Sequence, residues 1–175
     1  MAVTIKATEG APAEYPEVTV STDAEPFLSA AWQRIEAYTA FRTTGRDVEW
    51  IAEGCGEWVP PLRPATIATT EKWTGSAWEA IGVSPSPLGY CLPGGTFRLI
   101  GTAGDDDADV PLLITEAVRR LATYMAADPG TPGARSETRT TDEVGSDSLE
   151  RSPTWIAQAL QLSGAADLLR NFRRA

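Results

Sequence analysis

Residues 71–83 read EKWTGSAWEAIGV, and this stretch indicates that the chain is more than a bundle of helices. Thr74-Gly75 is typical of a tight turn between two short strands, which would place Trp73 and Trp78 opposite each other. Cross-strand pairs of this kind stabilise a sheet by roughly 0.2–1 kcal/mol. We therefore predict a β-hairpin here.

The hairpin lies inside a longer segment, residues 46–103, in which short apolar runs alternate with glycine and proline. Pro60-Pro61 and Pro93-Gly94-Gly95 are typical of turns or bulges. Runs this short, broken this often, favour strands over helices. We expect five or six short antiparallel strands, inserted between helices.

Helical periodicity flanks this segment on both sides. Residues 23–45 repeat apolar side chains at the spacing of a helix, and Gly45 is a suitable terminator. On the other side, Pro111 suits a first helical position and residues 113–125 form one apolar face. Residues 23–128 are therefore expected to form a helical domain that contains the β-region.

The two ends of the chain differ from this domain. Residues 1–22 are predicted to be an extended arm, and residues 129–151 a long polar loop with few apolar side chains to bury. Ser152-Pro153 is a typical helix start, so residues 152–175 are predicted to be a C-terminal helix with a possible break at Ser163-Gly164.

These segments predict an α+β protein that is mainly helical. Its expected plan is a three-helix domain with a small inserted antiparallel β-region. A C-terminal docking helix would follow the long polar loop.

Catalysis is not expected, because the 175 residues include no histidine. This absence excludes serine and cysteine catalysis assisted by histidine, and also metal sites with histidine ligands. Cys55 lies between two glycines but has no base to activate it. The glycine-rich stretches lack the Lys-Ser/Thr that follows a phosphate-binding loop, so no cofactor is expected.

An aspartate run precedes the second helix and could suggest a cation site. It lacks the ligand spacing, central glycine and terminal glutamate of a calcium loop, so no metal is expected. The carboxylates would instead repel DNA or favour the positive end of the helix. The run consists of Asp105, Asp106, Asp107 and Asp109.

The net charge is −9 and is unevenly distributed. Residues 1–150 hold 11 basic and 23 acidic side chains, whereas residues 151–175 hold four arginines and one aspartate. The acidic body excludes a broad surface for duplex DNA. The basic tail could dock on an acidic partner, or its arginines could complement the helix dipole. Tryptophan is enriched at interfaces, and we expect Trp155 to be an interface anchor.

No membrane segment or secretion signal is expected. No stretch approaches eighteen apolar residues, and the first ten residues lack the apolar core of a signal peptide. Cys55 and Cys91 belong to no CxxC motif, so two reduced thiols are expected, with a single disulfide as the alternative.

The order of four short motifs resembles the head–tail connector (adaptor) proteins of long-tailed phages and of phage-derived gene transfer agents. An early helix ends near Thr44-Gly45-Arg46, a small β-region follows, and Val110-Pro111 opens a helix that carries AVRRLATY at residues 117–124. The chain closes with LLRNFR at residues 168–173. The resemblance covers roughly residues 27–128 and the last ten residues.

This resemblance implies a ring, usually of twelve copies, beneath the portal in the neck of a virion or phage-like particle assembled in the bacterial cytoplasm. DNA would pass through without sequence-specific binding, along an acidic wall that includes the aspartate run. The C-terminal segment would dock against the portal, and the opposite β-rich side would face a stopper or tail-terminator protein. The implied docking residues are Trp155, Leu168, Leu169, Arg170, Phe172, Arg173 and Arg174.

Other functions remain open at this point. A minor tail protein or a stopper-like head-completion protein would be a structural component placed elsewhere in the particle. An acidic DNA mimic would inhibit a DNA-binding protein by presenting carboxylates in place of phosphates. An enzyme based on Cys55 or on carboxylates would need a base that the sequence does not show.

Overall fold

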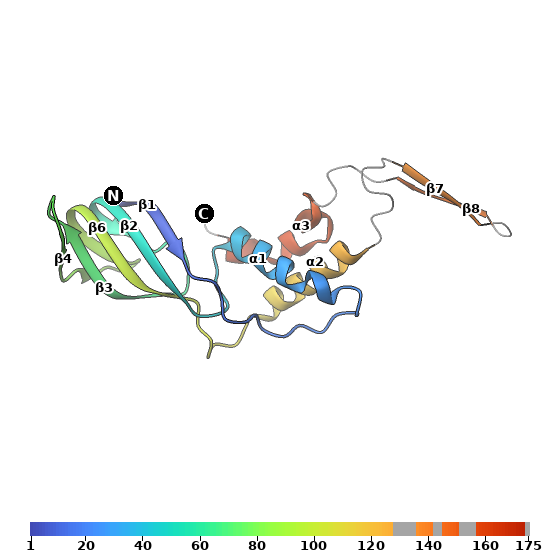
Figure 1. The fold of residues 1–175 in the computed structure, drawn as a ribbon, viewed down its shortest axis with the longest axis horizontal. Helices are drawn as coiled ribbons and strands as arrows, with labels where there is room; N and C mark the ends of the chain where they lie inside the picture. The colour runs from blue at the N-terminus through green and yellow to red at the C-terminus, as the bar shows by residue number, and fades with distance from the viewer. Residues whose placement is uncertain (128–135, 142–144, 151–156, 174–175) are drawn as a thin grey trace. The chain divides into compact units, whose positions relative to one another are not determined.

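A computed structural model describes residues 1–127, 136–141, 145–150 and 157–173. The chain divides into two compact units. The sheet unit comprises residues 1–16 and 39–109. The helical unit comprises residues 17–38 and the described residues from 110 onward. Each unit is therefore assembled from stretches that are separated in the sequence (Figure 1).

The sheet unit is built on a six-stranded antiparallel sheet with the order β1-β2-β6-β3-β4, and β5 pairs with one end of β6. The hairpin predicted at Thr74-Gly75 is confirmed, because Trp73 on β3 pairs with Trp78 on β4. The strands are β1 (Val3–Glu9), β2 (Arg46–Trp58), β3 (Ala65–Trp73), β4 (Trp78–Ala80), β5 (Ser84–Pro85) and β6 (Tyr90–Ala103).

One face of the sheet forms the core of this unit. Trp50 pairs with Leu99 across β2 and β6, and both side chains are fully buried. Trp58 packs edge-on against Trp50, with ring centroids 5.7 Å apart, and donates its indole N–H to the Thr4 hydroxyl. Strand alternation sends the intervening side chains to the opposite face. Trp50 and Trp58 therefore lie at the centre of the core of the sheet unit.

The helical unit contains α1 (Leu28–Thr39, whose last residue belongs to the sheet unit) and α2 (Leu112–Ala126). Trp32 and Ile35 on α1 are buried, as are Ile114, Val118 and Leu121 on α2. A short 3-10 helix, η1 (Glu25–Phe27), precedes α1. None of the helices in the described ranges has the length and apolar character needed to span a bilayer.

The C-terminal segment is not the single helix that the sequence predicted. It forms α3 (Ala159–Leu162), α4 (Ala165–Leu168) and a 3-10 helix, η2 (Arg170–Phe172). Gly164 separates α3 from α4 with a φ of +74°, a left-handed conformation that ends a helix and that glycine adopts without strain. The possible break at Ser163-Gly164 is therefore confirmed.

The predicted mainly helical class is wrong. The structure is 35% strand and 28% helix, and among the described residues only α1 and α2 reach seven residues. The first strand, β1, pairs with β2, so part of the predicted extended arm, residues 1–22, forms the edge strand of the sheet. The polar segment also contains a hairpin, β7 (Ser136–Thr141) and β8 (Gly145–Glu150).

Candidate functional site

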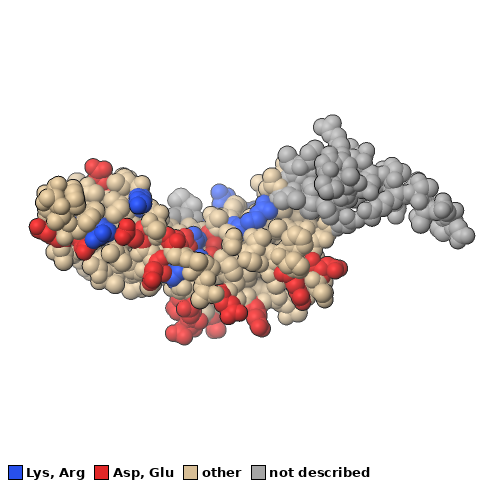
Figure 2. Space-filling model, viewed as in Figure 1, with Lys and Arg blue, Asp and Glu red and all other residues tan. Residues whose placement is uncertain are grey.

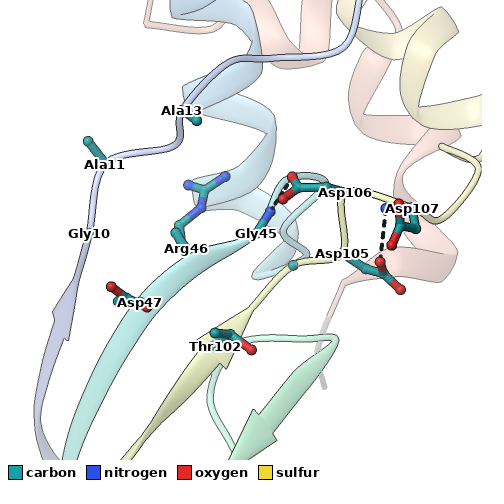
Figure 3. A pocket seen from close by; sticks show the side chains of 11 residues that line it. Gly10, Ala11, Ala13, Gly45, Arg46, Asp47, Thr102, Asp105, Asp106 and Asp107 are labelled. Atoms are coloured by element: carbon teal, nitrogen blue, oxygen red, sulfur yellow. Dashed lines mark hydrogen bonds between the residues drawn. The ribbon is translucent and has the colours of Figure 1, made fainter.

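A hollow of about 530 Å³ lies in the sheet unit, where β2 begins and β6 ends (Figure 3). Three segments build it: the chain that follows β1, the start of β2, and the loop that follows β6. The lining residues are Gly10, Ala11, Ala13, Gly45, Arg46, Asp47, Thr102, Gly104, Asp105, Asp106 and Asp107.

Backbone geometry fixes the loop after β6 at this end of the sheet. Gly104 has a φ of +89°, and a Cβ added there would lie 2.0 Å from the carbonyl oxygen of Thr44. A residue with a side chain would therefore push the two segments apart. The Gly104 N–H donates to the Pro64 carbonyl at 2.9 Å, which holds the same loop against a third segment.

Two of the aspartates in this loop accept local backbone hydrogen bonds. The Gly45 N–H donates to Asp106 Oδ1 at 2.8 Å, and the Asp107 N–H donates to Asp105 Oδ1 at 3.0 Å (Figure 3). These bonds orient the carboxylates without neutralising their charge. The aspartate run therefore presents fixed negative charge at the rim of the hollow.

An ion cluster beside the hollow links β1 to the start of β2. Arg42 Nη2 donates to Glu9 Oε2 at 2.8 Å, and Arg46 Nη1 donates to Glu9 Oε1 at 3.0 Å. The Arg46 side chain is only 3% exposed and also donates to the Thr44 carbonyl and hydroxyl oxygens. The hydrogen bond from Arg42, helped by the charges of both arginines, holds the pKa of Glu9 below its ordinary value.

The net character of this end of the sheet unit is acidic. Asp105, Asp106, Asp107 and Asp109 are exposed, and Figure 2 shows acidic side chains gathered around the loop that follows β6. Such a surface repels phosphate groups. No group of three or more cysteine, aspartate and glutamate side chains within the described ranges is arranged to hold a metal ion. The hollow therefore presents a charged, mainly acidic surface.

The residues expected to dock on a partner lie in the helical unit, and the structure separates them by burial. Leu169 is fully buried, as are Ala159 and Ala165 on the short helices before it. Leu168 and Phe172 are partly buried. Leu169 therefore belongs to the core of its own protomer. In this conformation its side chain is not accessible to a partner.

The two described arginines of the tail lie at the surface. Arg170 pairs with Asp167 at 2.7 Å, and both side chains are about three-quarters exposed. The guanidinium carbon of Arg173 lies 4.8 Å from the ring centroid of Tyr38 on α1. Arg34 Nη2 donates to the Ala157 carbonyl at 3.5 Å, so both ends of the described segment contact α1. Trp155 and Arg174 lie outside the described residues.

Sequence reasoning identified the aspartate run but missed the groups around it. Arg42 and Arg46 lie beside or within the Thr44-Gly45-Arg46 motif, but nothing local in the sequence indicates that both are buried and share one acidic partner. Glu9 could not be identified as that partner, because its register with β2 depends on a pairing between distant segments. The aspartate run and the tail arginines also fall in different units.

The solved structures that share this fold include three chains from gene transfer agent particles. A chain from the neck of an empty gene transfer agent particle, computed with C6 symmetry, is 20% identical with a TM-score of 0.52, over 87% of this chain and 78% of that one. A chain from the neck of a native particle, computed with C12 symmetry, is 17% identical with a TM-score of 0.50, over 89% and 84%.

The third chain, from the virion of a native gene transfer agent particle, is 17% identical with a TM-score of 0.56, over 87% of this chain and 77% of that one. No protein-family model and no curated protein sequence matches the chain. The fold is that of chains in the neck of a phage-like particle. This confirms the resemblance to head–tail connectors at the level of fold.

Proposed function

We propose that this chain is a structural, non-catalytic component of the neck of a tailed phage or phage-like particle, where it acts as a head–tail connector. The observation that carries the proposal is the fold shared with gene transfer agent neck chains along 87–89% of its length. The order of the connector motifs in the sequence points independently to the same class of protein.

In this role, copies of the chain form a ring beneath the portal. The C6 and C12 symmetries of the two neck structures support a ring of repeated copies, and twelve is the number expected from the connector resemblance. A ring built from one kind of chain needs two different surfaces on each copy, each binding the other on the next copy.

DNA passes through the ring along an acidic wall. The exposed aspartates after β6 supply negative charge that keeps the phosphate backbone from adhering. The net charge of −12 over residues 1–150 supports the same function. We expect the loop that carries Asp105, Asp106, Asp107 and Asp109 to face the channel.

The C-terminal segment docks on the portal through its surface side chains. Arg170 and Arg173 are exposed, and Leu168 and Phe172 keep part of their apolar surface accessible. Trp155 and Arg174 complete the proposed docking set. Leu169 is left out, because it would have to leave the core of the helical unit. A stopper or tail-terminator protein would bind the opposite side of the ring.

A genetic deletion tests the place of the chain in the particle. Cells that lack this chain should accumulate DNA-filled heads without tails, and the full-length chain supplied in trans should restore tailed particles. Electron microscopy of the purified particles measures both. Normal tailed particles in the deletion strain would contradict the connector function.

A charge reversal tests the docking segment. Arg170→Glu should weaken binding of the full chain to purified portal, because it replaces an exposed positive charge that meets the partner. Lys6→Glu is the matched control, since Lys6 is exposed on β1, outside the docking segment. Binding is measured by surface plasmon resonance at two salt concentrations. Equal affinity of both variants would exclude Arg170 from the portal contact.

A further inference from the structure

Three side chains lie together on the adjacent strands β3, β4 and β6, and we call them the aromatic patch: Trp73, Trp78 and Arg98. The two indole rings lie 5.2 Å apart between centroids, and the Arg98 guanidinium carbon lies 4.9 Å from the centroid of Trp78. The Glu71 carboxylate pairs with the same guanidinium. Trp73 is 40% exposed although it is one of the largest side chains in the chain.

The aromatic patch lies on the face of the sheet that is opposite the core. Arg98 stands between Phe97 and Leu99 on β6, and both of these neighbours are fully buried. Strand alternation therefore directs Arg98 to the other face. Glu71 pairs with Arg98 across the strands, and Trp73, two residues further along β3, shares that face.

A second apolar feature lies on the core side of the sheet, and we call it the proline pocket. It has a volume of about 270 Å³ and lies between the segment after β2 and the turn before β6. Its lining includes Leu62, which packs against the core cluster, and Leu88, which is 68% exposed. The lining residues used here are Val59, Pro60, Pro61, Leu62, Arg63 and Leu88.

The aromatic patch projects from one side of the sheet unit, and the proline pocket is hollowed into the other. One chain cannot bring them together, because they lie on opposite faces of its own sheet. Two copies can, and the contact then repeats from copy to copy in one direction, as a ring requires. We propose that the aromatic patch of one copy binds the proline pocket of the next. This inference rests on the proposed ring.

The composition of both features suits a contact of this kind. Tryptophan and arginine are the residues most enriched among those that dominate interface energies, and they act by filling pockets on the partner. Trp78 and Glu71 already fix the position of Arg98, so little side-chain freedom is lost on binding. Prolines add a rigid apolar wall that needs no ordering when the partner arrives.

Self-association of the full chain tests the proposal. The test variants are Leu88→Glu in the proline pocket and Trp73→Ala in the aromatic patch, and Leu112→Glu is the control. Leu88→Glu should weaken self-association about 30-fold or more, the loss expected at a dominant interface residue. Leu112 on α2 is 86% exposed, so the same substitution there places the same charge at another exposed leucine and should change nothing. Trp73→Ala should match Leu88→Glu. Sedimentation velocity over a range of concentrations measures the association.

Mixing the two defective variants is the decisive measurement. Trp73→Ala keeps a normal proline pocket and Leu88→Glu keeps a normal aromatic patch, so a mixture should form a one-to-one complex and nothing larger. Native mass spectrometry of the mixture detects it. Because each variant supplies the half that the other lacks, the complex would also show that both are folded.

Three results would overturn the proposal: no self-association of the unaltered chain, equal association of all variants, or no complex in the mixture. If association survives in every variant, the ring forms through other surfaces and the connector function stands. If Leu88→Glu instead abolishes binding to purified portal, the proline pocket belongs to the portal. Tailed particles in the deletion strain would remove the connector function separately.

Discussion

The sheet unit and the helical unit are stabilised in different ways. The sheet unit buries large rings, Trp50, Trp58 and Phe97, beneath a ladder of long strands. The helical unit also buries Trp32, but most of its buried side chains are aliphatic or alanine, including Ala31, Ala117, Ala159 and Ala165. Its C-terminal segment, which the sequence marks as free to dock, contributes to its own core. An apolar, basic C-terminal segment is therefore not by itself evidence of an unoccupied surface.

The largest loss of stability is expected from a substitution in the core of the sheet unit. Trp50→Ala should lower the free energy of unfolding by about 3–5 kcal/mol, because it removes a fully buried ring and leaves a cavity. Urea denaturation followed by far-UV circular dichroism measures this loss. If the two units unfold independently, the helical transition should keep its midpoint. A loss below about 1 kcal/mol would show that the ring is not part of the core.

The next effect tests the assignment of the C-terminal segment. Leu169→Ala should cost about 2–4 kcal/mol, whereas the exposed control Arg170→Ala should stay within about 0.5 kcal/mol. Urea titration of both variants, followed by helical circular dichroism, provides the comparison. A neutral Leu169→Ala would return this side chain to the set available for the portal.

The third effect concerns the ion cluster that joins β1 to the start of β2. Glu9→Gln should lower stability at neutral pH by about 1–3 kcal/mol, because Arg42 and the nearly buried Arg46 lose a charged acceptor. Thermal unfolding with Lys6→Gln, also on β1, as control measures the difference. Equal melting of both variants would contradict a stabilising role for the cluster.

The same carboxyl group sets a pH dependence. The pKa of Glu9 is lowered in the folded state, so its contribution is present above the ordinary value of 4.5 and is lost as the pH falls through the folded value. Unfolding of the unaltered chain between pH 7 and pH 3 should therefore show a component that Glu9→Gln lacks. Parallel curves for the two proteins would refute this linkage.

The smallest expected effect on stability comes from an exposed ion cluster on α2. Glu116 accepts hydrogen bonds from Arg119 and Arg120, and these lower its pKa to about 2. Carbon-detected NMR titration should find the pKa below the ordinary glutamate value of 4.5, and added salt should move it back toward that value. The carboxyl group is at the surface, so these ion pairs contribute little to the free energy of unfolding. A titration at the ordinary value would show that the pairs do not persist in solution.

Local patterns predicted the elements whose cause is local. The Thr74-Gly75 turn signal located the hairpin, and the periodicity of residues 113–125 located α2. The prediction of a mainly helical class was wrong because several strands pair with segments that are distant in the sequence. Residues 1–22 gave no sign that β1 would pair with β2, some forty residues later, and the polar strands β7 and β8 carry no alternation of apolar side chains.

In the candidate site, too, the sequence predicted local features but not those that depend on distant segments. Charge alone identified the aspartate run, because its chemistry lies in four residues close together in the sequence. The proline pocket was interpreted only as a turn at Pro60-Pro61, since nothing local indicates that Leu88 lies beside it. The burial of Leu169 in its own protomer was not predicted, because an apolar side chain looks the same in sequence whether its own protomer or a partner covers it.

The division of both units along the chain constrains the order in which the protein can fold during synthesis. β1 leaves the ribosome first but cannot pair until β2 has followed, and α1 must wait for α2 after the whole sheet segment has been made. The sheet unit is therefore complete once residue 109 has been made, whereas the helical unit waits for the C-terminal segment that ends with η2. A nascent chain that stalls before β6 has been made would expose the strand edge of β2 and the apolar face of α1 at the same time.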